Sequence, residues 1–296
     1  MESKKEYVPI KGLSIIGESI NDSIPSTHEF FEKDDIDSIQ SLAKLQAEKG
    51  AKYIDVNVGK RDGLFMAHIV KKVQEVVDIP ISIDSPDFEL QKAGLGVYNI
   101  ERAKGAKPIV NSISELRMEL FELNKIKPFC PILIASERSE NGKRCSNKSG
   151  VEIKETAKRL IYKCKNEFNI INNEIIVDPG LGPIGADMQG MTKTTLEGMR
   201  YISQEGDFKG IHISVGLSNF TQMLPSKTKS GKFVKTPLEG AFLTLAMPVG
   251  LDFIVGNPKK KYKILEKDHA ALIALKKAIN AGGLDSIIQL QYFLMS

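Results

Sequence analysis

Four polar side chains in this sequence each follow a short apolar run. Asp84 ends the run Ile-Ser-Ile, Asn111 ends Ile-Val, and Asp178 ends Ile-Ile-Val. Asn219 follows Ile-Ser-Val-Gly-Leu-Ser in the same way. A β-branched run that ends in a carboxylate or an amide is typical of a barrel in which strands alternate with helices, because the carboxyl ends of its strands form one shared mouth. We therefore expect these four side chains to meet around one ligand.

Four further polar residues occupy related positions. Asp55 and Asn57 end another apolar run, and Glu18 and Asn21 follow the first one. Carboxylates accept hydrogen bonds, whereas amides both donate and accept them. Such a set suits a flat heterocycle with alternating donors and acceptors, such as a pterin, whose 2-amino group and N3–H would face a carboxylate.

Residues of these types also have purely structural roles at such positions. An Asp or Asn at a strand end serves as a helix N-cap or a turn former, and Asp178-Pro179-Gly180 by itself is a plausible turn. No His and Cys set has the spacing of a zinc site, and no His accompanies a Ser or Cys in a nucleophile motif. Because four strand ends share the same acid-or-amide character, we favour one binding site over four unrelated turns.

Eight strands would bring these residues together, and the sequence contains eight strand-like runs. They lie at 13–17, 53–58, 81–84, 108–111, 131–135, 174–178, 211–217 and 253–255. Apolar residues at helical spacing lie between them, and Lys49-Gly50 and Ala93-Gly94 are the expected ends of two helices. We predict an α/β protein with a single (β/α)8 TIM barrel. It would be one domain over residues 1–296, with the barrel at about 13–280 and a helical tail at about 284–296. An open, doubly wound sheet is the alternative, and it usually has fewer strands.

Composition narrows the class of protein. The chain has 296 residues, with 41 Lys and Arg against 37 Asp and Glu, an excess too small and dispersed to predict nucleic-acid binding. Its three cysteines form no CxxC pair, which indicates free thiols in a reducing compartment. The N-terminal stretch 1–7 lacks the apolar core of a signal peptide, and no apolar run is long enough to span a membrane. We predict a soluble, cytoplasmic protein.

Two connections are longer than a strand–helix loop needs, at residues 136–150 and 220–235, and both carry several basic residues. Both follow strands, so we expect them at the mouth as lids or partner surfaces, the alternative being solvated, mobile loops. The tail after Gly282-Gly283 is expected to be an amphipathic helix that pads the barrel bottom or forms a dimer contact.

Several short motifs, taken together, resemble a known family. In chain order they are Ile16-Gly17-Glu18-Ser19-Ile20-Asn21, Asp55-Val56-Asn57-Val58-Gly59, Ile83-Asp84-Ser85, Val110-Asn111-Ser112, Val177-Asp178-Pro179 and Gly216-Leu217-Ser218-Asn219-Phe220-Thr221-Gln222. They look like the pterin-binding methyltransferases that move a methyl group between tetrahydrofolate and a corrinoid. The likeness runs from about residue 13 to residue 256. It departs at Ser19, where related enzymes carry Arg, and in the Lys-rich stretch after Gln222, which looks inserted.

This resemblance implies a function and a set of site residues. Asp84, Asn111 and Asp178 would hold the pterin ring, Asn219 would be the catalytic residue near N5, and Gln222 would lie close behind it. Glu18, Asn21, Asp55 and Asn57 would support them, and no metal would be bound. The tail of the folate would point outward, where lysines of the two long loops would meet its carboxylates.

The same resemblance implies the substrates and partners. Tetrahydrofolate or 5-methyltetrahydrofolate would be one substrate, and a corrinoid such as cobalamin would be the methyl carrier. The closest likeness is to methylcobalamin:tetrahydrofolate methyltransferases of anaerobic demethylation, as of glycine betaine. The chain has no Asp-x-His-x-x-Gly pattern for binding cobalt, so either free methylcobalamin or a separate corrinoid protein would deliver the methyl group. A homodimer is also expected from the resemblance.

Two other functions remain as alternatives. Dihydropteroate synthase shares the barrel and the Asp178-Pro179-Gly180 stretch, but this chain lacks a cationic cluster after its seventh strand, where Leu217-Ser218-Asn219 stands. A non-catalytic pterin-binding subunit is the second alternative, since sequence alone does not distinguish binding from turnover.

Overall fold

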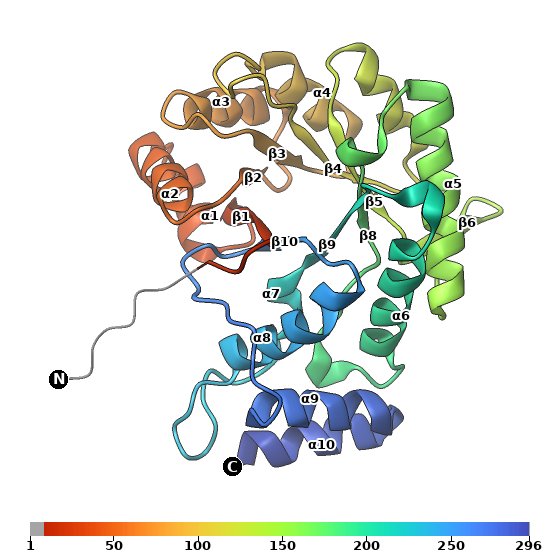
Figure 1. Cartoon of the computed structure of the whole chain (residues 1–296). Helices are drawn as coiled ribbons and strands as arrows, with labels where there is room; N and C mark the ends of the chain where they lie inside the picture. Colours follow the sequence, from red (N-terminus) through yellow and green to blue (C-terminus); the bar gives the residue numbers. More distant parts are fainter. Residues whose placement is uncertain (1–8, 296) are drawn as a thin grey trace.

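Eight parallel strands close into a barrel within residues 9–295, the part of the chain that the computed structural model describes (Figure 1). The stretch 1–7, from which we predict no signal peptide, lies outside the described residues, as does Ser296. Around the barrel the strands follow the order β1-β10-β9-β8-β5-β4-β3-β2. Their bounds are β1 Ser14–Asn21, β2 Tyr53–Asn57, β3 Ile81–Asp84, β4 Ile109–Ile113, β5 Cys130–Ile134, β8 Ile176–Asp178, β9 His212–Gly216 and β10 Phe253–Gly256. The predicted TIM barrel and its eight strands are confirmed.

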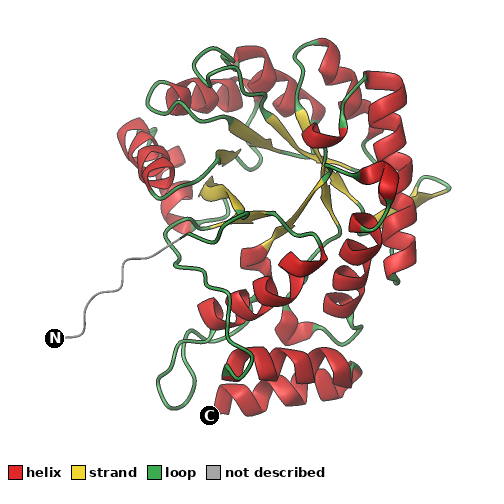
Figure 2. Cartoon of the chain, viewed as in Figure 1, coloured by secondary structure: helices red, strands yellow, loops and turns green. Residues whose placement is uncertain are grey.

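Helices surround the strands and form the outer layer (Figure 2). The α-helices are α1 Pro25–Glu32, α2 Ile36–Glu48, α3 Gly63–Gln74, α4 Phe88–Val97, α5 Gly150–Phe168, α6 Met191–Ser203, α7 Leu217–Phe220, α8 Lys235–Ala246, α9 Ala270–Ala281 and α10 Gly283–Met295. After β4 a 3-10 helix, η1 Met118–Lys125, takes the place of an α-helix. Shorter 3-10 turns are η2 Asn172–Glu174, η3 Ile184–Ala186, η4 Gly206–Phe208 and η5 Met247–Val249. Within residues 9–295, no helix is long and apolar enough to cross a membrane.

The apolar residues form two separate layers, as the barrel geometry requires. Inside the barrel, Ile16, Ile109, Ile132 and Ile176 pack together as a buried cluster. A much larger cluster, which includes Val56, fills the space between the strands and the helices. Because successive side chains of a strand point to opposite faces, the β-branched runs can supply both layers at once.

Strand β1 is longer than predicted. Its pairing with β2 shifts register between Gly17 and Ile20, so one extra residue is accommodated there as a bulge. The backbone N–H of Ser19 donates to Oε1 of the buried Gln46 side chain at 2.9 Å, a contact that helps hold the bulge. The strand then continues to Asn21, and both Glu18 and Asn21 therefore belong to the mouth end of β1.

The expected helix end at Ala93-Gly94 is wrong, because α4 continues through Gly94 to Val97. A Cβ atom at Gly94 would lie 2.9 Å from Cδ1 of Ile83, closer than such atoms normally approach. Glycine is therefore present to let α4 pack closely on β3, and not to end the helix. The other expected end is confirmed: α2 ends at Glu48, and Gly50 has a φ of +90°.

The long connection at 136–150 contains a small antiparallel hairpin, formed by β6 Glu137–Glu140 and β7 Lys143–Ser146. Asn141 and Gly142 make its two-residue turn, with φ values of +52° and +76°. Both values are positive, as in the type I′ turns that favour the pair Asn-Gly. The connection therefore contains regular structure, and its expected role as a lid or partner surface stays a prediction.

The C-terminal helix α10 packs along α9 on the outside of the barrel (Figure 1). It also contacts η3, which follows β8 at the mouth, and the backbone carbonyl of Leu294 accepts a hydrogen bond of 3.1 Å from the N–H of Lys229. The expectation that this tail pads the barrel bottom is therefore wrong, because its partners are an outer helix and the loops at the mouth.

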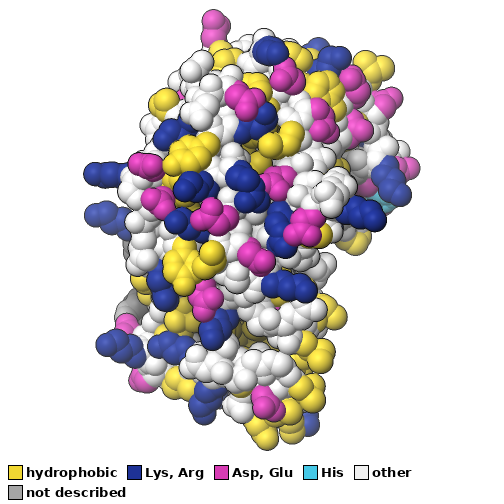
Figure 3. Space-filling view, turned by 90° about the vertical axis from the view of Figure 1, so that its right-hand side faces the viewer, with side chains coloured by type: hydrophobic (Ala, Val, Ile, Leu, Met, Phe, Trp, Pro, Cys, Tyr) yellow, Lys and Arg dark blue, Asp and Glu magenta, His cyan; other side chains and the backbone are white. Residues whose placement is uncertain are grey.

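Basic and acidic side chains are interspersed on the face that carries α5 and α6 (Figure 3). Many of them form ion pairs, such as Lys154 with Glu205 at 2.6 Å and Arg159 with Glu115 at 2.6 Å. Since the charges alternate in sign, the described residues form no continuous basic stripe on this face.

Candidate functional site

A cavity of about 390 Å³ lies at the carboxyl ends of the barrel strands. Its lining comprises Glu18, Asn21, Asp55, Asp84, Asn111, Ile134, Ser136, Asp178, Gly180, Leu181, Gly216, Asn219 and Val255. Every strand of the barrel, or the loop that follows it, contributes at least one of these residues. The cavity is therefore the shared mouth that the strand-end residues predict.

Two aspartates of the lining, Asp55 and Asp84, are each bound by an amide side chain from another strand. The Nδ2 group of Asn57 donates to Oδ2 of Asp84 at 2.9 Å, and Nδ2 of Asn111 donates to Oδ1 of Asp55 at 3.2 Å. Asp55 and Asp84 lie close enough together for the charge of Asp84 to raise the pKa of Asp55. This network fixes the orientation of Asp84 and Asn111 before any ligand arrives.

Burial shifts the protonation of this pair. Asp55 is 1% exposed, and its burial and the nearby Asp84 raise its pKa well above the usual range. Burial also raises the pKa of Asp84, although hydrogen bonds from Asn57 and Asp55 oppose the increase. Burial therefore disfavours the ionised form of both carboxyl groups.

Asp178 combines both roles considered for it from the sequence. Its Oδ1 atom accepts a hydrogen bond of 2.7 Å from the backbone N–H of Gly180, whose φ is +83°, so it does form a turn. Its carboxyl group also lines the cavity. Burial raises the pKa of Asp178 from 3.8 to about 6, while the Gly180 N–H acts in the opposite direction.

Glu18 connects the first strand to the segment that carries Asn219. The hydroxyl of Ser218, the residue immediately before Asn219, donates a short hydrogen bond to Oε1 of Glu18. Burial raises the pKa of Glu18, whereas the Ser218 hydroxyl and the Lys260 ammonium lower it in part. Lys260 is itself paired with Glu239 at 2.7 Å.

The charge of the cavity is one-sided. Four carboxyl groups line it, those of Glu18, Asp55, Asp84 and Asp178, and among the described residues no Lys, Arg or His joins the lining. Burial raises the pKa of each of these four groups, and for Asp55 the charges of Asp84 and Glu18 add to the increase. The site therefore favours a ligand that presents several hydrogen-bond donors and little negative charge.

The sequence profile of pterin binding enzymes matches residues 20–255. This chain belongs to the pterin-binding enzyme family. A relative named methylcorrinoid:tetrahydrofolate methyltransferase, from Eubacterium limosum, is 30% identical over 257 residues, which are 83% of this chain and 86% of that one. The family resemblance predicted from the strand-end motifs is thereby confirmed.

Solved structures of other pterin-binding enzymes share the barrel at lower sequence identity. A dihydropteroate synthase from Clostridium difficile aligns with a TM-score of 0.55 and 20% identity, covering 83% of this chain and 90% of that one. The enzyme from Yersinia pestis aligns with a TM-score of 0.57 and 13% identity, covering 91% and 94%. These likenesses establish the fold.

Most residues predicted for the site of this pterin-binding enzyme do come together. Those lining the cavity are Glu18, Asn21, Asp55, Asp84, Asn111, Asp178 and Asn219. Asn57 lies behind the lining and holds Asp84. Gln222 is exposed and lies outside the cavity lining, so the structure does not bring it to the other residues.

Two polar residues of the site were not predicted. Ser136 lines the cavity just after β5, and the rule of a polar residue after an apolar run would have found it. The local sequence around Ser218 could not predict its role, because its hydrogen bond with Glu18 joins residues that are 200 positions apart.

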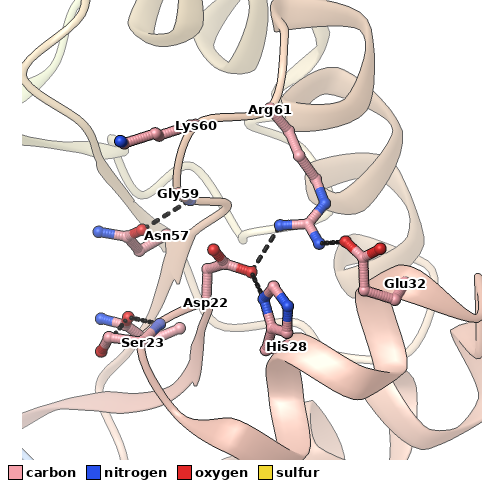
Figure 4. A pocket seen from close by; sticks show the side chains of 9 residues that line it. Asp22, Ser23, His28, Glu32, Asn57, Gly59, Lys60 and Arg61 are labelled. Carbon is pink, nitrogen blue, oxygen red and sulfur yellow. Dashed lines mark hydrogen bonds and ion pairs between the residues drawn. The ribbon is translucent and has the colours of Figure 1, made fainter.

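A second cavity of about 640 Å³ adjoins the first one, since Asn21 lines both. Figure 4 shows this second cavity, in which Arg61 points toward Asp22 and Glu32. Arg61 is held in this second cavity by ion pairs of 2.5 Å with Asp22 and with Glu32. Its guanidinium also lies near the rings of two phenylalanines, Phe31 and Phe65, at 5.1 and 5.2 Å from their centres. Arg61 thus ties the segment after β1 to the segment after β2, next to the site of the pterin-binding enzyme.

Proposed function

We propose that this pterin-binding enzyme transfers a methyl group between a corrinoid and N5 of tetrahydrofolate, forming 5-methyltetrahydrofolate. The observation that carries the proposal is the lining of the cavity, which has four carboxyl groups and, among the described residues, no cation. A pterin ring presents an amino group and ring N–H groups to such acceptors. The name of the Eubacterium limosum relative gives independent support for the two substrates.

The same lining argues against the synthesis of dihydropteroate. That reaction expels diphosphate, a highly charged group that cations stabilise. Two of the cations near this cavity are already paired, Arg61 with Asp22 and Glu32 and Lys260 with Glu239. Neither of them lines the cavity.

Within this proposal, Asp84, Asn111 and Asp178 hold the pterin ring. Asp84 and Asn111 are oriented by Asn57 and Asp55. Asn219 lies across the mouth and hydrogen-bonds N5, because an amide can donate to the lone pair of N5 or accept from a protonated N5. Gln222 would act only if the loop that carries it moves toward the cavity.

The transfer itself depends on alignment. The methyl carbon must lie between N5 and cobalt. Holding the reactants in such a geometry can lower the activation barrier by about 7 to 11 kcal/mol. The described chain offers no cobalt-binding His motif of its own, so the methylcorrinoid enters as a substrate, free or carried by a partner protein. The hairpin β6–β7 and the loop 220–235 flank the mouth and are the proposed contact surface.

Anaerobic optical spectroscopy tests the proposal. Methylcobalamin, tetrahydrofolate and catalytic protein should show loss of the methyl-Co(III) bands, growth of Co(I) and formation of 5-methyltetrahydrofolate. Tight folate binding without turnover, with free methylcobalamin and with corrinoid proteins alike, would instead indicate a pterin-binding subunit. Formation of dihydropteroate from a pterin diphosphate and 4-aminobenzoate would indicate the synthase.

Three expectations stay predictions: a role in an anaerobic demethylation pathway, a cytoplasmic location and a homodimer. Sedimentation analysis of the purified protein would check the homodimer.

A further inference from the structure

The proposed methyl transfer leaves a proton that the protein must accept. N5 of tetrahydrofolate is a secondary amine. When it attacks the methyl carbon, the N–C bond forms and the carbon–cobalt bond breaks, with both electrons remaining on cobalt. N5 then carries the methyl group, its original hydrogen and a positive charge. The product 5-methyltetrahydrofolate forms only when that proton is transferred to a base. The Asn219 amide does not serve, because a neutral amide is not a base at ordinary pH.

Among the described residues, the four carboxyl groups of the cavity lining are the bases available there. Asp55 is bound by the Asn111 amide and Asp84 by the Asn57 amide, on strands β2 to β4. Asp178 directs one oxygen to the Gly180 N–H within its own turn. These hydrogen bonds hold the three groups to strands β2 to β4 and to the turn after β8, and none of them reaches the segment that carries Asn219.

Glu18 differs from them in its position. It lies at the mouth end of β1, which pairs with β10, and β10 pairs with β9, the strand that leads to Asn219. The Ser218 hydroxyl links the Glu18 carboxyl group directly to the residue before Asn219. Glu18 is therefore the lining carboxyl group that is hydrogen-bonded to the Asn219 segment.

We propose that Glu18 is the base that takes the N5 proton during methyl transfer to tetrahydrofolate, and the acid that returns it in the opposite direction. This inference rests on the proposed methyltransferase function. The carboxylate gains the proton that N5 loses, so charge and atoms balance without any further reactant. Ser218 acts as a positioning residue, because its hydroxyl fixes one carboxyl oxygen and leaves the other free for the proton.

The surroundings of Glu18 suit this role. Its burial raises the pKa of the carboxyl group, which makes the carboxylate a stronger base than an exposed glutamate. The charged groups around it are Lys260, which stabilises the carboxylate, and Glu239 and Asp55, which oppose it.

Three variants test the inference in the full-length protein. Glu18→Gln keeps the size of the side chain and an acceptor for the Ser218 hydroxyl, but cannot take a proton. We expect its turnover with methylcobalamin to fall by about 10²-fold or more, the usual contribution of a general base. Its Kd for tetrahydrofolate, measured by calorimetry, should stay within about threefold. The wild-type rate should rise with pH as Glu18 loses its proton, and this rise should disappear in Glu18→Gln.

The second variant, Glu18→Asp, retains a carboxyl group and should recover part of the rate together with the pH dependence. The third, Glu29→Gln on the exposed face of α1, is a matched control that should leave both unchanged. Circular dichroism should show the same folded content in all three.

Two results would overturn the inference. One is a Glu18→Gln variant with wild-type turnover and the wild-type pH profile. The other is a variant that loses folate affinity while its rate at saturation is unchanged, which would assign Glu18 to binding alone. A wild-type protein that binds folate but transfers no methyl group would refute the proposed function itself, whatever the variants show.

Discussion

Replacing Asp178 by Asn should stabilise the free protein while it weakens folate binding. The side chain of Asp178 has a pKa of 3.8 in an unfolded chain and about 6 in the folded one, because folding buries its carboxylate. A pKa that rises on folding means that the ionised group opposes folding. Its contribution is therefore favourable at low pH and is lost as the pH rises through about 6. Asparagine has nearly the same shape, carries no charge, and its Oδ1 can still accept from the Gly180 N–H.

The size of the effect follows from these two pKa values. One pKa unit corresponds to about 1.4 kcal/mol, so the ionised Asp178 destabilises the fold by up to about 3 kcal/mol at pH 7. The same linkage gives about 2 kcal/mol at pH 5 and less than about 1 kcal/mol at pH 4. These are upper values, because Asp178 lines a cavity that admits solvent.

Urea unfolding of the wild type and of Asp178→Asn, at pH 4, 5 and 7, measures this difference. We expect the variant to be more stable at pH 7, and the gain to shrink as the pH falls. In calorimetry at pH 7, the variant should bind tetrahydrofolate at least about tenfold more weakly, because a buried charged acceptor is lost. A variant that is no more stable than the wild type, or whose difference is the same at every pH, would refute the reasoning.

Three further substitutions test other parts of the structure. Asn219→Ala should lower the rate of methyl transfer by about 10²-fold with little change in folate affinity, as for the loss of one transition-state hydrogen bond. An unchanged rate in single-turnover kinetics would remove Asn219 from the mechanism. Gly94→Ala should cost about 1 to 3 kcal/mol in urea unfolding, because the new methyl group meets Ile83, and an unaffected midpoint would show that α4 shifts freely. Lys260→Met should destabilise the protein by about 3 kcal/mol in urea unfolding, because Glu239 is 0% exposed and would lose its paired cation. The double variant with Glu239→Gln should recover most of that stability, and a double variant as unstable as Lys260→Met would contradict this account.

The sequence predicted the strands well, because each is a short run of β-branched residues that fills both faces of a barrel wall. Glu18 and Asn21 stand out in the sequence as polar residues after the first run. Their place on β1 does not, because the bulge between Gly17 and Ile20 breaks the alternation that marks a strand. The Asn141-Gly142 pair is a local signal for the hairpin, since it is the preferred type I′ turn.

Contacts between distant residues could not be predicted in this way. The Asp55–Asp84 pair depends on the register of β2 against β3, where Asp55 lies opposite Ser82. Nor does local sequence distinguish Gly94, which fits against Ile83, from Gly50, which ends a helix. Both glycines follow a helical stretch, and only the packing of α4 on the barrel separates their roles.

The last turn of α10 is joined by a hydrogen bond to the loop that follows α7. The carbonyl of Leu294 accepts a hydrogen bond from Lys229, in the loop between β9 and α8 that begins just beyond Asn219. A substitution or truncation that displaces the last turn of α10 would therefore remove a backbone contact of this loop. Rates measured on such variants need the unchanged chain as a comparison.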